Sequence, residues 1–235
     1  MIIIRNEKLI KRNTQIGRYS GFLSIAILAG GMYLSFRYQD QVLFSMAALI
    51  LGFTLSQVGI LYSNRFVRSP RPDQQLDNAL KGLDDQYTII HYQSPVSHLL
   101  VGPAGIWVLF PFYQKGRIIY DEKKGRWKRI GGNFYLRFFA QDTIGRPAQE
   151  INDTEKRLRK SLGNIPELEL PFIKSALVFT NEKVEVDADN APSPTLHARQ
   201  LKKLIRKEAK GAAALSTYDL KTIQDYYNPS HQKQN

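Results

Sequence analysis

The chain contains no cysteine, and only four of its 235 residues are histidines. The first absence excludes disulfides, cysteine-based metal sites and cysteine nucleophiles, and is compatible with a reducing compartment. The histidines, His91, His98, His197 and His231, show no spacing typical of metal ligands. Acidic residues are also few: 21 against 33 lysines and arginines, a net charge of +12. This excess indicates an anionic partner, either nucleic acid or a phospholipid surface.

Two stretches, residues 19–36 and 42–62, contain no charged side chain. At about 1.5 Å per residue, a helix of either length covers a hydrocarbon core of ~30 Å. With the short connection 37–41, they predict a transmembrane helical hairpin. A cleaved signal peptide is disfavoured, because no small-x-small cleavage site follows the first stretch and a second apolar stretch does. The lack of ionisable groups within both stretches argues against a transporter.

Basic residues flank the predicted hairpin on its outer sides, whereas the connection has only Arg37, opposed by Asp40. This asymmetry predicts that both termini are cytoplasmic, with the lipid bilayer as one partner. Small residues four apart, Ala26 with Gly30 and Gly52 with Ser56, predict close packing of the two helices. The oligomeric state is left open.

The rest of the chain predicts an α/β domain. Apolar residues at helical spacing follow residue 73, and strand-like runs, a helix opening at Pro147 and a basic amphipathic helix over 196–210 come after it. For that last helix, docking on the domain is favoured over lying on a membrane. The predicted organisation is a basic cytoplasmic N-terminus (1–18), the hairpin (19–62), a juxtamembrane linker (63–72), the domain (73–210), and a C-terminal helix and tail (211–235).

The most informative stretch is 96–118. It predicts a strand hairpin, with a Gly-Pro-Ala-Gly turn at 102–105 between two apolar runs. Gly105 supplies the positive φ that such a turn needs. The order Leu-Leu-Val-Gly-Pro-x-Gly-Ile-aromatic-Val-Leu, followed by Tyr-x-x-Gly-Arg-Ile, resembles the core of the nuclease-related domain (NERD). That family is related to the restriction-endonuclease-like nucleases, so the resemblance implies a mixed sheet flanked by helices. A small two-span anchor with such a domain suits a bacterial cytoplasmic membrane.

The same resemblance implies where nuclease chemistry would lie. In the family, an Asp and a Glu-x-Lys on the two strands hold a divalent metal and polarise the attacking water; the matching positions here are Ser97, Phe110 and Phe112. A hydroxyl and two aromatic rings cannot replace hard anionic ligands and a cation. Asp73 falls where the family has a Glu on its first helix, and Gln149 matches a helix Gln. The favoured interpretation is a helix N-cap for Asp73 and a capping or packing role for Gln149.

A basic and aromatic segment follows the hairpin. Its cations are candidates for binding nucleic acid or another anion: Lys115, Arg117, Lys123, Lys124, Arg126, Lys128 and Arg129. Interleaved aromatic residues, including Phe134 and Tyr135, could stack on bases. The favoured alternative is two strands, 117–121 and 127–130, joined by a charged turn, with the aromatic side chains facing the core.

Two function classes follow. The first is a membrane-anchored pseudonuclease, a non-catalytic module that binds or scaffolds a nucleic acid or protein partner and needs no metal or cofactor. The second is a metal-dependent nuclease on DNA or RNA with an atypical site, which would use Mg²⁺ and Asp73 with Asp121 or Glu122. The first is favoured, because phosphodiester hydrolysis needs several converging carboxylates.

Overall fold

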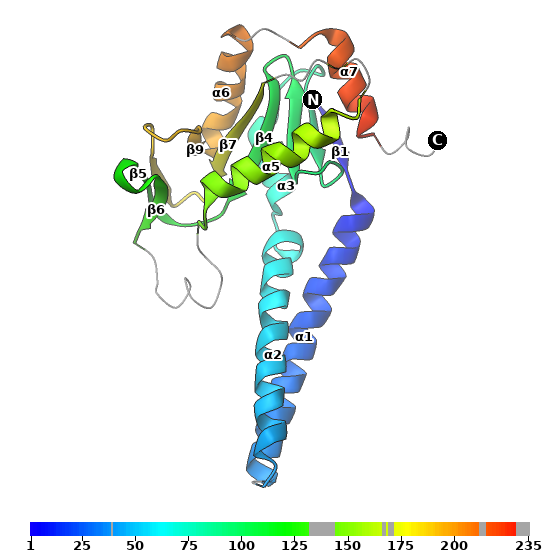
Figure 1. The fold of residues 1–235 in the computed structure, drawn as a ribbon, viewed down its shortest axis with the longest axis vertical. Coiled ribbons are helices and arrows are strands. Elements are labelled where there is room, and N and C mark those ends of the chain that lie inside the picture. Colours follow the sequence, from blue (N-terminus) through cyan, green and yellow to red (C-terminus); the bar gives the residue numbers. More distant parts are fainter. Residues whose placement is uncertain (39, 132–143, 166–167, 169–171, 212–214, 229–235) are drawn as a thin grey trace. The chain divides into compact units, whose positions relative to one another are not determined.

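The computed structural model describes residues 1–38, 40–131, 144–165, 168, 172–211 and 215–228 (Figure 1). The chain forms two compact units. One comprises Met1–Asn6 together with Pro72–Asn235, and the other comprises Glu7–Arg71. The first six residues therefore belong to the larger unit, whereas the sequence analysis had grouped them with residues 7–18.

The smaller unit is a helical hairpin. It consists of α1 (Glu7–Arg37), α2 (Val42–Tyr62) and one π-helical turn, η1 (Ser63–Val67). Both long helices are apolar and long enough to cross a membrane, and only 17% of each apolar window is buried. A core helix of a soluble protein would be mostly buried, so the exposed apolar surface distinguishes these helices from that class. Helix α1 starts well before the predicted span, and η1 continues the helix into part of the predicted linker.

Small residues line the seam between α1 and α2. A Cβ added to Gly31 would lie 2.6 Å from Ala48 Cβ, and one added to Gly52 would lie 2.6 Å from Leu28 Cγ. The prediction for Gly52 is therefore confirmed. The prediction for Ala26 and Gly30 is wrong, because both are exposed and a Cβ on Gly30 would meet nothing within 4 Å. The glycine of α1 that faces α2 is therefore Gly31, one residue after the predicted Gly30.

The larger unit contains a mixed six-stranded sheet in the order β1-β2-β3-β4-β7-β9. Its strands are β1 (Ile2–Arg5), β2 (Thr88–His91), β3 (His98–Gly102), β4 (Gly105–Phe112), β7 (Ile173–Phe179) and β9 (Thr195–His197). Strands β2, β3 and β4 are antiparallel neighbours, whereas β1 pairs with β2 in parallel and β7 is parallel to both β4 and β9. The parallel edge strand β1 was not predicted from the sequence.

Helices cover both faces of this sheet, with α5 crossing one of them (Figure 1). Helices α3 (Pro72–Leu80) and α6 (Ala198–Gly211) bury Leu76, Leu80, Leu201 and Ile205 against the face that carries Trp107 and Leu109. Helices α5 (Pro147–Leu162) and α7 (Thr217–Tyr226) pack on the opposite face, which carries Val108. The central strands are therefore apolar on both faces, as expected for a sheet between two helical layers. The apolar side of α6 is used for docking, which confirms that prediction.

A second sheet of three strands, in the order β6-β5-β8, extends the unit. It is formed by β5 (Gly116–Asp121), β6 (Arg126–Ile130) and β8 (Val184–Asp187), and the 3₁₀ turn η2 (Glu122–Lys124) joins β5 to β6. Trp127 is buried, stacks edge-on against Tyr120, and donates its indole N–H to Thr195 Oγ1 at 2.9 Å. The predicted pair of strands with inward-facing aromatic side chains is confirmed for this part. Phe134 and Tyr135 lie outside the described residues.

The structure confirms the turn of the predicted strand hairpin. Gly102 pairs with Gly105, whose φ is +91°, so the glycine takes the left-handed conformation expected of it. Strand β4 continues to Phe112, further than the predicted end at Phe110. The amphipathic segment over 196–210 begins as β9, and its helix starts at Ala198, because the first residues pair with β7.

Candidate functional site

The three positions that the resemblance matched to catalytic residues, Ser97, Phe110 and Phe112, lie at one end of β3 and β4. Ser97 immediately precedes β3, and its carbonyl accepts a hydrogen bond from the Tyr92 N–H at 2.9 Å. Leu99 pairs with Val108, so continuing the antiparallel register places Ser97 opposite Phe110. Phe110 and Phe112 point to the same face of β4, since their separation is two residues. The structure thus brings these positions together at one level of the sheet.

The two phenylalanines at these positions are partly buried and pack against apolar clusters of the domain. Phe110 packs against the apolar cluster beneath α5 and α7. Phe112 stacks on Phe179 of β7, with ring centroids 5.3 Å apart and an interplanar angle of 21°. Such stacking stabilises the sheet by the burial of apolar surface. The side chains of Ser97, Phe110 and Phe112 include no carboxylate.

The remaining family-matched residues lie elsewhere. Gln149 is exposed in the first turn of α5, and the start of that helix has no side-chain cap, so the expected capping or packing role is not found. Asp73 is the second residue of α3, fully buried, and forms an ion pair with Arg5. Its interpretation as an N-cap is therefore wrong. Helix α3 begins one residue earlier, at Pro72, which is a favourable first helical residue.

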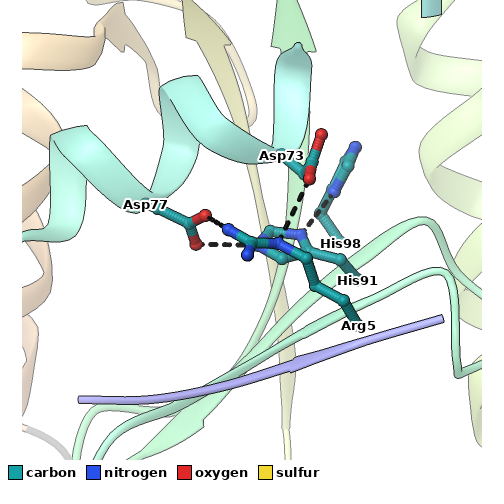
Figure 2. Close-up of polar contacts among 5 residues, drawn as sticks. All are labelled: Arg5, Asp73, Asp77, His91 and His98. Atoms are coloured by element: carbon teal, nitrogen blue, oxygen red, sulfur yellow. Dashed lines mark hydrogen bonds and ion pairs between the residues drawn. The ribbon is translucent and has the colours of Figure 1, made fainter. Parts of the chain in front are cut away.

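Asp73 belongs to a buried polar cluster, defined here as Arg5, Asp73, Asp77, His91 and His98 (Figure 2). Arg5 Nε lies 3.2 Å from Asp73 Oδ2, and its guanidinium also pairs with Asp77. His91 Nε2 lies 3.0 Å from Asp77 Oδ1, and His91 Nδ1 lies 2.8 Å from His98 Nδ1. The two acidic side chains come from α3 and the other three from adjacent strands. The cluster therefore ties α3 to β1, β2 and β3.

Strand register explains why these side chains meet. Arg5 pairs with His91, and His91 pairs with His98, so the three residues form a row across three neighbouring strands. Leu100 of β3 and Ile89 of β2 face α3, and residues two positions away share that face. The row therefore points toward α3, where Asp73 and Asp77 are four residues apart on one side of the helix.

Tyr92 closes the cluster at the end of β2. It is the one described non-glycine residue with positive φ, at 59°. Its buried ring packs edge-on against His98, with centroids 5.0 Å apart. A tyrosine in this region of φ carries local strain, which surrounding packing must offset.

This cluster was not predicted from the sequence. Sequence spacing of histidines reveals ligand pairs on a single helix but not residues opposed across strands. A usable signal was present: His91 and His98 lie in two neighbouring strand patterns joined by a short turn. Arg5 could not be added, because no pattern indicated that the first residues form a strand of the distant sheet.

The basic candidates lie on and around the β5–β6 hairpin. Arg117 pairs with Asp187, and Lys128 pairs with Asp121, whose pKa is lowered by that hydrogen bond. Lys115, Lys123, Lys124 and Arg126 are exposed and have no ion-pair partner within the described part of the chain. Arg129 is half-buried and donates to the carbonyl of Gly131 at 3.4 Å. The structure therefore leaves four of the seven cations available to an external anion.

The three candidate acids, Asp73, Asp121 and Glu122, do not converge as a hydrolytic metal site requires. Asp121 and Glu122 lie at the end of β5 in the second sheet, where Glu122 accepts a hydrogen bond from Asn190 at 2.8 Å. Asp73 lies on α3, against the first sheet. Among the residues that the structure describes, no group of three His, Asp or Glu side chains is arranged to hold a metal ion.

Comparison with known proteins adds no relative: no family model, curated protein or solved structure matches the chain.

Proposed function

We propose that the chain is a membrane-anchored pseudonuclease of NERD-like fold, which binds or scaffolds a partner at the cytoplasmic face and does not cleave phosphodiesters. The observation that carries this proposal is the presence of Ser97, Phe110 and Phe112 at the three positions that the resemblance matches to catalytic residues. Both rings are partly buried against apolar neighbours, and none of the three side chains supplies the carboxylate or the cation that the chemistry needs.

Membrane anchoring is supported by exposed apolar side chains along α1 and α2, such as Phe22, Phe36 and Leu43, each more than 70% exposed. In water this surface would drive association, whereas in a bilayer it is solvated by lipid tails. Parallel pairing of β1 with β2 adds a second argument. It requires Met1–Asn6 and the larger unit to share one compartment, so the intervening hairpin crosses the bilayer an even number of times.

The orientation with both termini in the cytoplasm rests on the basic flanks, and the natural absence of cysteine makes it directly testable. Single cysteines replacing Asp40 in the connection and Lys123 in the second sheet would be treated with a membrane-impermeant maleimide in intact bacterial cells. We expect labelling of Asp40→Cys alone. Labelling of Lys123→Cys alone would reverse the orientation, and labelling of both would contradict the hairpin.

The candidate partner surface is the group of exposed cations Lys115, Lys123, Lys124 and Arg126. Phosphate contacts by such residues weaken steeply as salt concentration rises, because binding releases counterions. Within the proposed function, nucleic acid is one partner class that these cations fit and an acidic protein surface is another. The salt dependence of binding to a defined nucleic acid distinguishes these two partner classes.

The function is tested on the full chain in detergent or lipid nanodiscs, with DNA and RNA, across a salt series and with Mg²⁺ or Mn²⁺. We expect no cleavage under any condition. If nucleic acid is the partner, Lys123→Gln with Lys124→Gln weakens retention and flattens its salt dependence, whereas Lys203→Gln with Lys207→Gln on α6 serves as the matched control. Metal-dependent cleavage that Asp73→Asn abolishes would overturn the pseudonuclease proposal. Absence of both binding and cleavage would indicate a protein partner.

A further inference from the structure

The hydrogen bonds of the buried polar cluster limit how many protons its two histidines can hold. An ionised Asp77 only accepts, so His91 Nε2 carries a proton toward it. The two Nδ1 atoms are 2.8 Å apart, so one proton lies between them. His98 Nε2 is the remaining ring nitrogen. The hydrogen bond between the two Nδ1 atoms therefore exists when the two rings together carry two or three protons. A fourth proton would place an N–H on both Nδ1 atoms, and these two groups would repel each other.

The charges around the pair favour the third proton. The cluster takes its members from α3, β1, β2 and β3, whose charged groups are Asp73, Asp77 and Arg5. The titratable phenol of Tyr92 belongs to the ring that packs against His98. Two carboxylates and one guanidinium leave one negative charge when both histidines are neutral. Asp73 is fully buried, and the side chain of Asp77 is 11% exposed. Because a net buried charge is costly, one proton on the pair restores neutrality.

We propose that His91 and His98 form a one-proton site, which takes up a single proton beyond its neutral form and thereby strengthens the attachment of β1 and α3 to the sheet. The site lies next to both ends of the helical hairpin along the chain, so its proton affects how the chain is held at these two points. Arg5 is the last residue of β1, and α1 begins at Glu7; Asp73 is the second residue of α3, and the hairpin unit ends at Arg71. The cluster thus fastens the two points where the chain enters and leaves the hairpin.

The sign of the effect follows from linkage. Where the folded state holds one more proton than the unfolded chain, stability rises as pH falls, and the unfolding constant changes by up to about tenfold per pH unit. The window lies above about pH 6.5, the range in which an exposed histidine takes up its proton. This inference is independent of the proposed function, since it concerns fastening within the domain and not partner binding.

The test uses the full chain in detergent, with urea unfolding followed by tryptophan fluorescence at several pH values. Both tryptophans, Trp107 and Trp127, are in the domain, so the signal reports on it alone. We expect wild-type stability to rise as pH falls through the window. Asp77→Asn removes the excess negative charge, and His98→Phe removes one ring of the pair, so both flatten the dependence. Asp187→Asn, which alters an exposed carboxylate paired with Arg117, is the matched control and should follow the wild type.

A second measurement needs no variant that perturbs the cluster. NMR titration of isotope-labelled histidines in the wild-type chain counts the protons bound, with His197 assigned by His197→Gln as an internal reference. One proton shared by His91 and His98 before unfolding supports the proposal. Uptake of two independent protons, or of none down to acid unfolding, overturns it. So does a pH dependence of stability that Asp77→Asn leaves parallel to the wild type.

Discussion

Replacement of Arg5 by alanine tests the buried polar cluster most severely. Asp73 is fully buried and the Arg5 side chain is 25% exposed, so the substitution removes a cation from beside a carboxylate that water does not reach. Breaking a buried pair by removing one partner costs about 3–5 kcal/mol, because the remaining charge stays unsolvated. The partial exposure of Arg5 lowers this figure, and we expect Arg5→Ala to reduce the free energy of unfolding by about 3 kcal/mol.

The matched control is Arg117→Ala. The Arg117–Asp187 pair has the same chemistry, but its side chains are 50% and 55% exposed, and exposed pairs contribute only about 0–1 kcal/mol. Both variants would be unfolded by urea in the same detergent, with the fluorescence of Trp107 and Trp127 as the signal. A double variant, Arg5→Ala with Asp73→Asn, should recover part of the loss, because it removes the stranded charge.

The reasoning would be refuted if Arg5→Ala and Arg117→Ala lowered the free energy of unfolding by equal amounts. It would also fail if Asp73→Asn brought no recovery in the Arg5→Ala background. Either result would mean that the cluster is not held by the burial of its carboxylates.

Three further predictions follow from packing and burial. Gly31→Leu should destabilise the hairpin by about 1–3 kcal/mol, because its side chain would collide with Ala48, whereas Gly30→Leu should have little effect; the loss of helical circular dichroism in sodium dodecyl sulfate measures both. Gly102→Ala should cost a similar ~1–3 kcal/mol in urea unfolding, since an added Cβ would overlap the buried Tyr87 ring, while Gly211→Ala meets nothing and is the control. Burial raises the pKa of Tyr227 to about 12, so the folded state keeps a proton that the unfolded chain loses near pH 10. Stability should therefore fall between about pH 10 and pH 12, and less so in Tyr227→Phe, as seen by comparing urea unfolding of the two proteins across that range.

Local patterns predicted most elements of the larger unit. The turn at Gly102–Gly105, the helix opening at Pro147 and the hairpin of β5 with β6 each depend on neighbours in sequence, and all three are present. Boundaries shifted where pairing with a distant strand decided them. The first residues of the segment predicted as a helix form strand β9, because they pair with the backbone of β7. Sequence periodicity does not reveal this pairing.

The candidate site was harder to predict because it depends on long-range pairing. The positions of Ser97, Phe110 and Phe112 followed from one local hairpin. The buried polar cluster needs β1 beside β2, a contact between residues more than 80 apart, and no pattern in Ile2–Arg5 specifies that neighbour. The prediction of which small residues lie between α1 and α2 was wrong for a different reason. Gly30 and Gly31 are adjacent, and a rotation of the helix by about 100° decides which of them faces α2.

The parallel pairing of β1 with β2 also has a consequence for biosynthesis. Strand β1 is made before α1, yet its neighbour Thr88–His91 is made only after both α1 and α2 have been synthesised. Until then the strand has an unsatisfied backbone and nothing to pair with. If α1 and α2 insert as a pair, Met1–Asn6 stays on the side where β2 emerges and the sheet closes; if one helix fails to insert, the bilayer separates the two strands. Under the proposed membrane topology, completion of the sheet therefore depends on the insertion of both helices, because only then does β1 lie in the same compartment as β2.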